Sequence, residues 1–198
     1  MDLVEGAMGS PWVFVALLGF AALDAFFPIV PSESLVITAG VFSAANGEPN
    51  LALVIVSAGL GAFLGDHVSY FIGRTAGERM MRRAKPGSKK AAAWERGHKL
   101  LTERGGVILI ICRYIPGART AITLTAGAVS YRLRSFSFFD AIAAGSWAAY
   151  SALVGYIGGE AFEDSPWKGL ALGLGIALTV TGLVEVIRHL RRPRTATS

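Results

Sequence analysis

The chain has 198 residues, of which 53% are hydrophobic and 17% are charged. A typical soluble domain has about 25% charged residues, so this composition excludes an ordinary soluble protein and indicates one compact integral membrane domain. The formal net charge of +5 is spread unevenly, because six carboxylates and no Lys or Arg precede Arg74.

The basic residues fall into two blocks. Ten of the 19 lie between Arg74 and Arg104, and four more lie between Arg188 and Arg194. The positive-inside rule predicts that both blocks are cytoplasmic. Contact with anionic lipid head groups accounts for them. No nucleic-acid partner is expected, since no aromatic interleaving or recognised fold accompanies the lysines.

The first predicted element is a helical hairpin over residues 11–47. Its first arm is apolar except for Asp24, and it ends in a break that contains Pro28 and Pro31. Proline suits the first turn of a new helix, so a second, shorter arm carrying Glu33 is expected after this break. The turn that follows has no positive charge and is predicted to lie outside.

A full-length transmembrane helix is predicted over residues 51–73, with Asp66 deep in the span. Its glycines are small residues that let membrane helices approach closely. Residues 74–104 form a basic cytoplasmic connector. The helix-breaking cluster 85–88 divides it in two, and its second part, 91–103, is compatible with either a lipid-docked or a solvated surface helix.

Residues 105–129 form the second predicted hairpin. This apolar segment carries Arg113 and Arg119 on either side of Pro116 and Gly117. Proline removes a backbone donor and glycine loosens the turn, so the helix should stop near Pro116 and restart after Gly117. A broken helix with charges at membrane depth is normally buried in protein or lines a polar cavity.

Two further transmembrane helices are predicted over residues 136–158 and 167–188, followed by a cytoplasmic tail, 189–198. The chain must cross the membrane an even number of times between its two cytoplasmic blocks. The segment 105–129 must therefore return to the side from which it enters, which makes it a re-entrant hairpin. Each arm has roughly 10 residues, about 15 Å of helix, enough to reach the bilayer midplane.

The two halves of the chain share this plan. Thr38-Ala39-Gly40 follows the first break as Thr125-Ala126-Gly127 follows the second, and a Gly-x-x-x-x-Tyr spacing recurs at residues 65–70 and 145–150. The hairpins precede crossings in opposite directions, so the pattern predicts an inverted repeat of the kind found in transporters. Coincidence between two apolar segments rich in Gly and Pro is the alternative.

The predicted fold is therefore an all-α integral membrane protein. It is an inverted repeat of two re-entrant helical hairpins, each followed by a transmembrane helix, with one more transmembrane helix at the C-terminus.

The hairpins place charges at membrane depth, where an unpaired charge costs about 2.5 to 3.5 kcal/mol. They should face each other or water. Arginine has a planar fork that matches phosphate, and a helix restarting after the break turns its positive end toward an anion. Arg113 and Arg119 are predicted to bind a substrate phosphate. Asp24, Glu33 and Asp66 are predicted charge partners that carry protons.

Structural explanations compete with these assignments. The charges could form buried salt bridges that only lock the hairpin tips together. Apolar replacement of buried ion pairs is often neutral or stabilising, which argues against packing as their only purpose. For Asp66, the alternative is that it caps a helix or binds backbone near the interface.

No enzyme chemistry, metal or cofactor is expected. His67, His98 and His189 are scattered without metal-ligand spacing. The glycine pattern at residues 59–65 lacks the strand and spacing of a dinucleotide fingerprint, and no phosphate-binding loop is present. Ser32, Asp66 and His67 could be assembled into a triad, but their spacing does not ask for one.

At these motifs the sequence resembles the DedA family of bacterial membrane proteins, which is related to the VTT-domain proteins of eukaryotes. The match covers nearly the whole chain. The matching stretches are Phe27-Pro28-Ile29-Val30-Pro31-Ser32-Glu33-Ser34 with Ala39-Gly40, Gly65-Asp66-His67-Val68-Ser69-Tyr70-Phe71-Ile72-Gly73-Arg74, Arg113-Tyr114-Ile115-Pro116-Gly117-Ala118-Arg119 with Ala126-Gly127, and Glu185-Val186-Ile187-Arg188-His189.

The resemblance implies two re-entrant hairpins that face each other in the bacterial cytoplasmic membrane, with the C-terminus cytoplasmic. It also implies transbilayer movement of phospholipid or of a polyprenyl-phosphate carrier such as undecaprenyl phosphate, linked to the proton-motive force. The family's two essential arginines fall on Arg113 and Arg119. Its two acids fall on Asp24, where many members have Glu, and on Glu33, where Asp is common.

The predicted function is a lipid flippase or scramblase that binds a lipid phosphate between the hairpin tips. Its partners would be lipids with an anionic phosphate head group and protons, and a homo-oligomer is left open. The alternatives are a proton-coupled ion or drug antiporter, which would use the same charges, and a membrane scaffold whose charge pairs are structural.

Overall fold

The computed structural model describes residues 6, 9–26, 32–83, 87–115 and 117–161. All regular secondary structure in this part of the chain is α-helical, which confirms the all-α prediction. The helices are α2 (Trp12–Asp24), α3 (Ser32–Asn46), α4 (Leu51–Arg82), α5 (Lys89–Arg113), α6 (Ala118–Ala128) and α7 (Leu133–Glu160). The predicted last span and tail, residues 167–198, lie outside the described residues, as do Pro28, Pro31 and Pro116.

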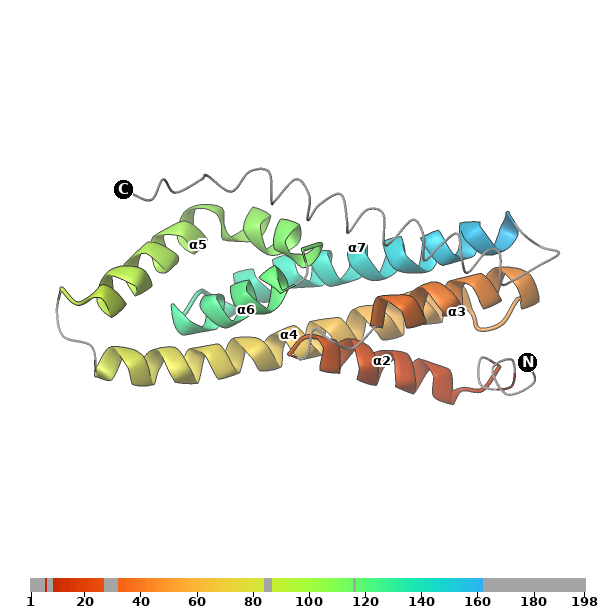
Figure 1. Ribbon diagram of the computed structural model, residues 1–198, viewed down its shortest axis with the longest axis horizontal. Coiled ribbons are helices and arrows are strands. Elements are labelled where there is room, and N and C mark those ends of the chain that lie inside the picture. Colours follow the sequence, from red (N-terminus) through yellow and green to blue (C-terminus); the bar gives the residue numbers. More distant parts are fainter. Residues whose placement is uncertain (1–5, 7–8, 27–31, 84–86, 116, 162–198) are drawn as a thin grey trace, which may run out of the picture.

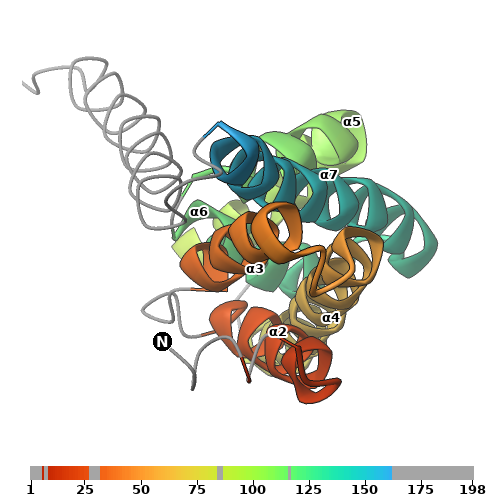
Figure 2. The ribbon, with the colours of Figure 1, turned by 90° about the vertical axis from the view of Figure 1, so that its right-hand side faces the viewer.

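Two long helices, α4 and α7, run antiparallel along the length of the molecule (Figure 1). Two pairs of helices lie against them. The antiparallel pair α2 and α3 occupies one end, and the pair α5 and α6 occupies the other, so that the inner ends of both pairs meet near the middle. Seen along the long axis, α2, α3, α4 and α7 gather side by side at the near end (Figure 2).

Side-chain caps explain where two of the helices begin. The Asn50 side chain accepts a hydrogen bond from Leu53 N at 3.2 Å at the start of α4, and Ser88 accepts one from Ala91 N at 3.3 Å at the start of α5. Such caps satisfy backbone donors that a helix leaves free at its first turn. Helix α4 ends before the predicted helix-breaking cluster, residues 85–88, and α5 begins directly after it.

The structure differs from the sequence analysis along α5. The sequence predicts that the segment 91–103 and the first arm of the second hairpin are separate elements. In the structure they form one continuous helix. Gly105 and Gly106 lie inside this helix although each glycine costs about 1 kcal/mol of helix propensity. The rings of Tyr131 and Phe139 pack on them so closely that a Cβ would lie within 3.0 Å of either ring. This packing supports the helix where the sequence alone predicts a boundary.

Glycines also bring the short helices against the long ones. At Gly73 of α4 a Cβ would overlap the carbonyl oxygen of Leu124 in α6, and at Gly155 of α7 a Cβ would overlap the carbonyl oxygen of Ile37 in α3. The backbones therefore touch with no side chain between them, as in small-residue packing of membrane helices.

Glycines on the short helices make the same kind of contact with carbonyl oxygens of the long helices. Gly127 of α6 faces the carbonyl oxygen of Tyr70 in α4, and Gly40 of α3 faces the carbonyl oxygen of Ala152 in α7. Helices α6 and α3 thus each approach the long helix of the other half of the chain, and in both approaches the Gly of a Thr-Ala-Gly triplet touches the long helix.

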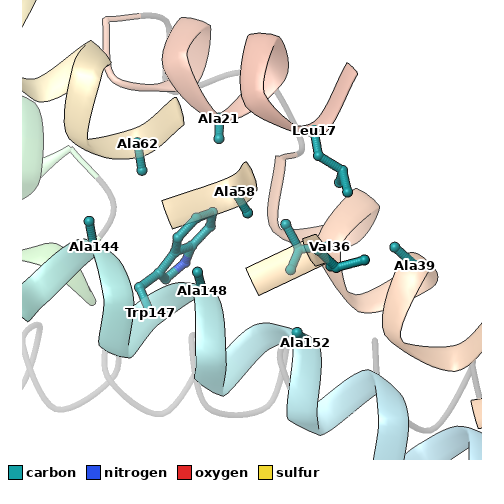
Figure 3. Packing of buried hydrophobic residues seen from close by; sticks show 11 residues of the cluster. Leu17, Ala21, Val36, Ala39, Ala58, Ala62, Ala144, Trp147, Ala148 and Ala152 are labelled. Atoms are coloured by element: carbon teal, nitrogen blue, oxygen red, sulfur yellow. The ribbon is translucent and has the colours of Figure 1, made fainter. Parts of the chain in front are cut away.

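The apolar core is divided between the two ends of the bundle. One cluster, from α2, α3, α4 and α7, consists of small residues around one large ring: Leu17, Ala21, Val36, Ala39, Val54, Ala58, Ala62, Ala144, Trp147, Ala148 and Ala152. Figure 3 shows the indole of Trp147 pointing from α7 toward Ala58 of α4. The other cluster comes from α4, α5, α7 and the end of α6, and it consists of Tyr70, Leu101, Leu109, Ala126, Val129 and Phe136.

Helix α4 is long and apolar enough to cross a membrane, and it is the one helix in the described part of the chain that meets this requirement. Its outward side carries exposed apolar side chains: Leu53, Val56, Leu60, Leu64, Val68, Phe71 and Ile72. These residues recur at helical spacing and give α4 one apolar face that no other described helix covers.

We expect Gly73→Ala to lower the free energy of unfolding by about 1 to 3 kcal/mol, because the added methyl group must push α6 away from α4. Gly59→Ala in the same helix is the matched control, since its Cβ would meet nothing nearer than 3.7 Å. Unfolding of both variants in detergent micelles would be compared. Equal stabilities would contradict the close packing of α4 and α6.

Candidate functional site

Arg113 lies at the end of α5 and is buried in the middle of the bundle, with its side chain only 1% exposed. Its Nη1 is 2.6 Å from Asp66 Oδ2 on α4 and 3.4 Å from Asp140 Oδ1 on α7. A guanidinium removed from water requires such partners. Arg113 therefore joins three helices through one charged atom.

Arg119 lies in the first turn of α6, after the interruption that separates α6 from α5. Its Nη2 is 3.3 Å from Asp24 Oδ2 at the end of α2, and its Nε is 3.7 Å from Asp66 Oδ1. Asp66 thus lies between the two arginines and forms an ion pair with each. The predicted meeting of Asp24, Asp66 and the two arginines is present in the structure.

The ends of the helices are also joined by neutral hydrogen bonds. Ser32 at the start of α3 donates to Asp24 Oδ2 at 2.7 Å, and Thr120 of α6 donates to the carbonyl oxygen of Ala25 at 2.9 Å. Gly117 precedes α6 with φ of 74°, a left-handed conformation that suits glycine. These contacts hold α2, α3 and α6 together around the charges.

Two polar atoms of Arg113 are left without partners. Nε and Nη2 are buried and make no hydrogen bond to any described residue. Together they form one edge of the guanidinium, with two roughly parallel N–H groups, which matches two oxygens of a carboxylate or phosphate. A buried donor without a partner costs about 1 to 3 kcal/mol. This unpaired edge is the feature of the site that is suited to bind an anion.

The face of the Arg113 guanidinium is covered by an aromatic ring. Its Cζ lies 5.5 Å from the centroid of the Trp147 ring. Arginine stacks on aromatic rings through a cation–π attraction. Since Trp147 is itself packed among the alanines of the first core cluster, it fixes the guanidinium against the rigid part of the bundle.

Not every predicted site residue joins this network. Glu33, in the first turn of α3, is half-buried and makes no hydrogen bond or ion pair with a described residue. Its role as a charge partner stays a prediction. Of the four residues predicted to break the hairpins, Gly117 alone is described.

Two members of the network were not predicted. Asp140 is 2% exposed and forms an ion pair with Arg113, and His67 Nδ1 lies 3.5 Å from Asp140 Oδ2. A signal for Asp140 was present, because it is the only charged residue in the apolar segment 136–158. His67 carried no such signal. Within the described residues, no group of three or more His, Cys, Asp or Glu side chains is arranged to hold a metal ion.

Comparisons with known proteins identify the family. The family model for the VTT domain matches residues 30–157. The chain is 29% identical over 168 residues to Protein DedA of Escherichia coli, covering 83% of this chain and 76% of that protein. It is 29% identical over 153 residues to the inner membrane protein YohD of Escherichia coli, covering 77% of this chain and 76% of that protein.

A further relative is an uncharacterized membrane protein of Mycobacterium tuberculosis. It is 28% identical over 184 residues, covering 92% of this chain and 81% of that protein. No solved structure matches the chain. The chain belongs to the VTT-domain family and is a DedA-family membrane protein.

We expect Asp66→Asn to lower the free energy of unfolding by about 3 kcal/mol, because it leaves buried Arg113 without its nearest counter-charge. Glu78→Gln is the control, since Glu78 and Arg74 form a half-exposed pair at 3.4 Å on the surface of α4. Loss of that pair should cost less than about 1 kcal/mol. Denaturation in micelles would measure both. Similar losses would mean that the buried network does not stabilise the bundle.

Proposed function

We propose that this protein is a flippase or scramblase. In this proposal it moves a lipid with a phosphate head group, such as undecaprenyl phosphate or a phospholipid, across the bacterial cytoplasmic membrane. The proton-motive force drives or gates the movement. The protein is a transporter and not an enzyme, and its partners are the lipid and protons.

The observation that carries the proposal is the free edge of Arg113. Nε and Nη2 are buried and unpaired within the described residues. Two carboxylates pair with the same guanidinium, and one of them also pairs with the second arginine. A phosphate has two oxygens to fill this edge and a negative charge to compete with the carboxylates for the guanidinium. Its lipid tail would stay in the bilayer, so that no wide aqueous pore is needed.

The carboxylates have a defined role in this mechanism. Asp66 pairs with both arginines, and Asp24 pairs with Arg119. They hold the guanidinium groups in position while the site is empty and stabilise charges that would otherwise be isolated in a low-dielectric interior. When the phosphate arrives, it takes over part of this pairing. The carboxylates are then free to bind protons.

The membrane arrangement is part of the same proposal. The pairs α2/α3 and α5/α6 would enter the bilayer as re-entrant hairpins from opposite sides, with their inner ends at the midplane. The reciprocal glycine contacts support an inverted repeat, because α6 approaches α4 as α3 approaches α7. In this arrangement the site lies between the halves, as in other inverted-repeat transporters.

Access to the site requires movement. Arg113 is enclosed, with its side chain 1% exposed, so the phosphate cannot reach it through the closed bundle. Separation of the inner helix ends on one side at a time would open the site to one leaflet and then to the other. The ends of α2 and α6 are held by a few hydrogen bonds and ion pairs, which can be exchanged.

The function is tested by lipid movement in vesicles that contain purified protein. We expect Arg113→Lys to reduce translocation of a polyprenyl phosphate about tenfold or more, because lysine keeps the charge but lacks the planar fork. We expect Arg119→Ala to abolish translocation. Arg134→Ala, an exposed arginine at the start of α7, is the control and should retain the wild-type rate.

The same experiment separates the alternatives. Wild-type vesicles that show saturable ion flux and no lipid movement would favour a proton-coupled antiporter. Full activity after simultaneous apolar replacement of the charges would favour a scaffold. A rate that does not respond to an imposed proton gradient would remove the proton-motive force from the proposal and leave a scramblase.

Cysteine labelling tests the hairpin arrangement. In a Cys112→Ser background, we expect single cysteines at Glu103 and Ser130 to react with an impermeant thiol reagent from the same side of the membrane. These positions flank residues 105–129, the part of α5 and α6 that is predicted to enter the membrane. Labelling from opposite sides would mean that this segment crosses the bilayer completely.

A further inference from the structure

His67 connects the buried charges to the surface of the bundle. It follows Asp66 on α4 and is 16% exposed at its side chain, whereas the side chain of Asp140 is 3% exposed. Its Nδ1 is 2.8 Å from the carbonyl oxygen of Phe63, and its Nε2 is 2.8 Å from Ser137 Oγ. The imidazole is thus held in one orientation, with Asp140 Oδ2 at 3.5 Å.

The hydrogen bonds assign the proton of the neutral ring. A backbone carbonyl only accepts, so Nδ1 carries the hydrogen and donates it to Phe63. Nε2 then accepts from the hydroxyl of Ser137, which can donate or accept by rotating. A proton arriving from water can bind Nε2, after which Nε2 donates to Ser137 Oγ. The site can therefore change its protonation state without moving the ring.

The network around His67 has an excess of negative charge. It joins three carboxylates, Asp24, Asp66 and Asp140, to two arginines. These charges come from α2, α4, α5, α6 and α7, and α3 adds the half-buried Glu33. Asp140 Oδ2 accepts no hydrogen bond from a described residue. Excess charge in a buried site is costly, and one added proton would offset it.

We propose that His67 and Asp140 form the site at which this network binds a proton, and that this proton and the substrate's phosphate bind together. The inference rests on the proposed phosphate site, and it replaces the acids named above by His67 and Asp140 as the groups that bind the proton. Protonated His67 attracts Asp140, which now shares its charge between the imidazolium and Arg113. The pull of Asp140 on Arg113 weakens, and the guanidinium becomes a better partner for phosphate.

Charge balance gives the sign of this coupling. Without the proton, an arriving anion adds its charge to an already negative network. With the proton, the three aspartates of the network are matched by two arginines and the imidazolium of His67, so the anion enters a network without excess negative charge among these groups. Proton binding therefore strengthens phosphate binding, and by reciprocity phosphate binding strengthens proton binding. Loading of the site takes up one proton with each phosphate, and release of the phosphate returns it.

The first test measures binding of dihexanoyl phosphatidylglycerol to the purified full-length protein at a series of pH values. Its phosphodiester keeps one negative charge over the range in which histidine titrates, so the probe adds no pH dependence of its own. We expect wild-type affinity to fall as pH rises, by up to about tenfold per pH unit, as for uptake of one proton with the anion. His67→Gln should bind with little pH dependence.

His98→Gln is the matched control, because His98 is exposed on α5 and stacks on Trp94 rather than on the charge network. It should keep the wild-type pH dependence. A pH dependence that survives in His67→Gln would overturn the inference. Absence of phosphatidylglycerol binding to the wild type at every pH would instead overturn the proposed phosphate site.

The second test does not depend on the lipid. Histidine-selective NMR in micelles would follow the His67 ring from about pH 5 to 8, the range in which histidine commonly titrates. We expect the His67 signal to titrate and its midpoint to change in Asp140→Asn, while the His98 midpoint stays the same. A His67 ring that keeps one protonation state over this range, or that ignores Asp140→Asn, would overturn the proton site.

Discussion

The buried ion pair between Arg113 and Asp66 is the interaction on which the centre of this protein depends. Its 2.6 Å contact joins the end of α5 to the middle of α4, and neither side chain is appreciably exposed. A guanidinium in such a place must be compensated, and removal of one partner leaves an isolated charge. The positions of α5, α4 and, through Asp140, α7 are therefore tied to one another. Asp66 extends the constraint to Arg119, and Arg119 extends it to Asp24 at the end of α2.

The charges can meet because the helices around them come unusually close. Glycines of α4 touch the backbones of α2 and α6, and glycines on α3 and α7 make the same kind of contact between those two helices. Small residues thus bring the end of α2, with Asp24, and the start of α6, with Arg119, within reach of Asp66. The aromatic ring of Trp147 then covers Arg113 from α7. The packing is tight where glycines bring the short helices against α4 and α7, and polar contacts join the inner helix ends.

Much of this arrangement was predictable from particular residues. The interruption between α2 and α3, the break before α6 and the helix ends beside 85–88 follow from proline and glycine at known positions, and the meeting of the buried carboxylates with the arginines follows from the cost of an unpaired charge. The continuity of α5 through Gly105 and Gly106 did not, because it depends on rings that reach these glycines from Tyr131 and Phe139. Asp140 was a missed signal, since it is the single charged residue of an apolar segment. Glu33 was expected beside the arginines and has no ion pair with a described residue.

The sequence by itself determined the class of the protein, its helical breaks and the need for its membrane-depth charges to find partners. These properties depend on composition and local chemistry, because hydrophobic length, proline and unpaired charge have the same consequences in any fold. Only the tertiary structure decided which carboxylate meets which arginine, since residues 47 and 95 positions apart in the chain become neighbours through helix packing. It also decided that His67 faces Asp140 and that one edge of Arg113 stays unpaired within the described residues. Those outcomes depend on the rotation and depth of each helix, which are set by close contacts between distant glycines and backbones.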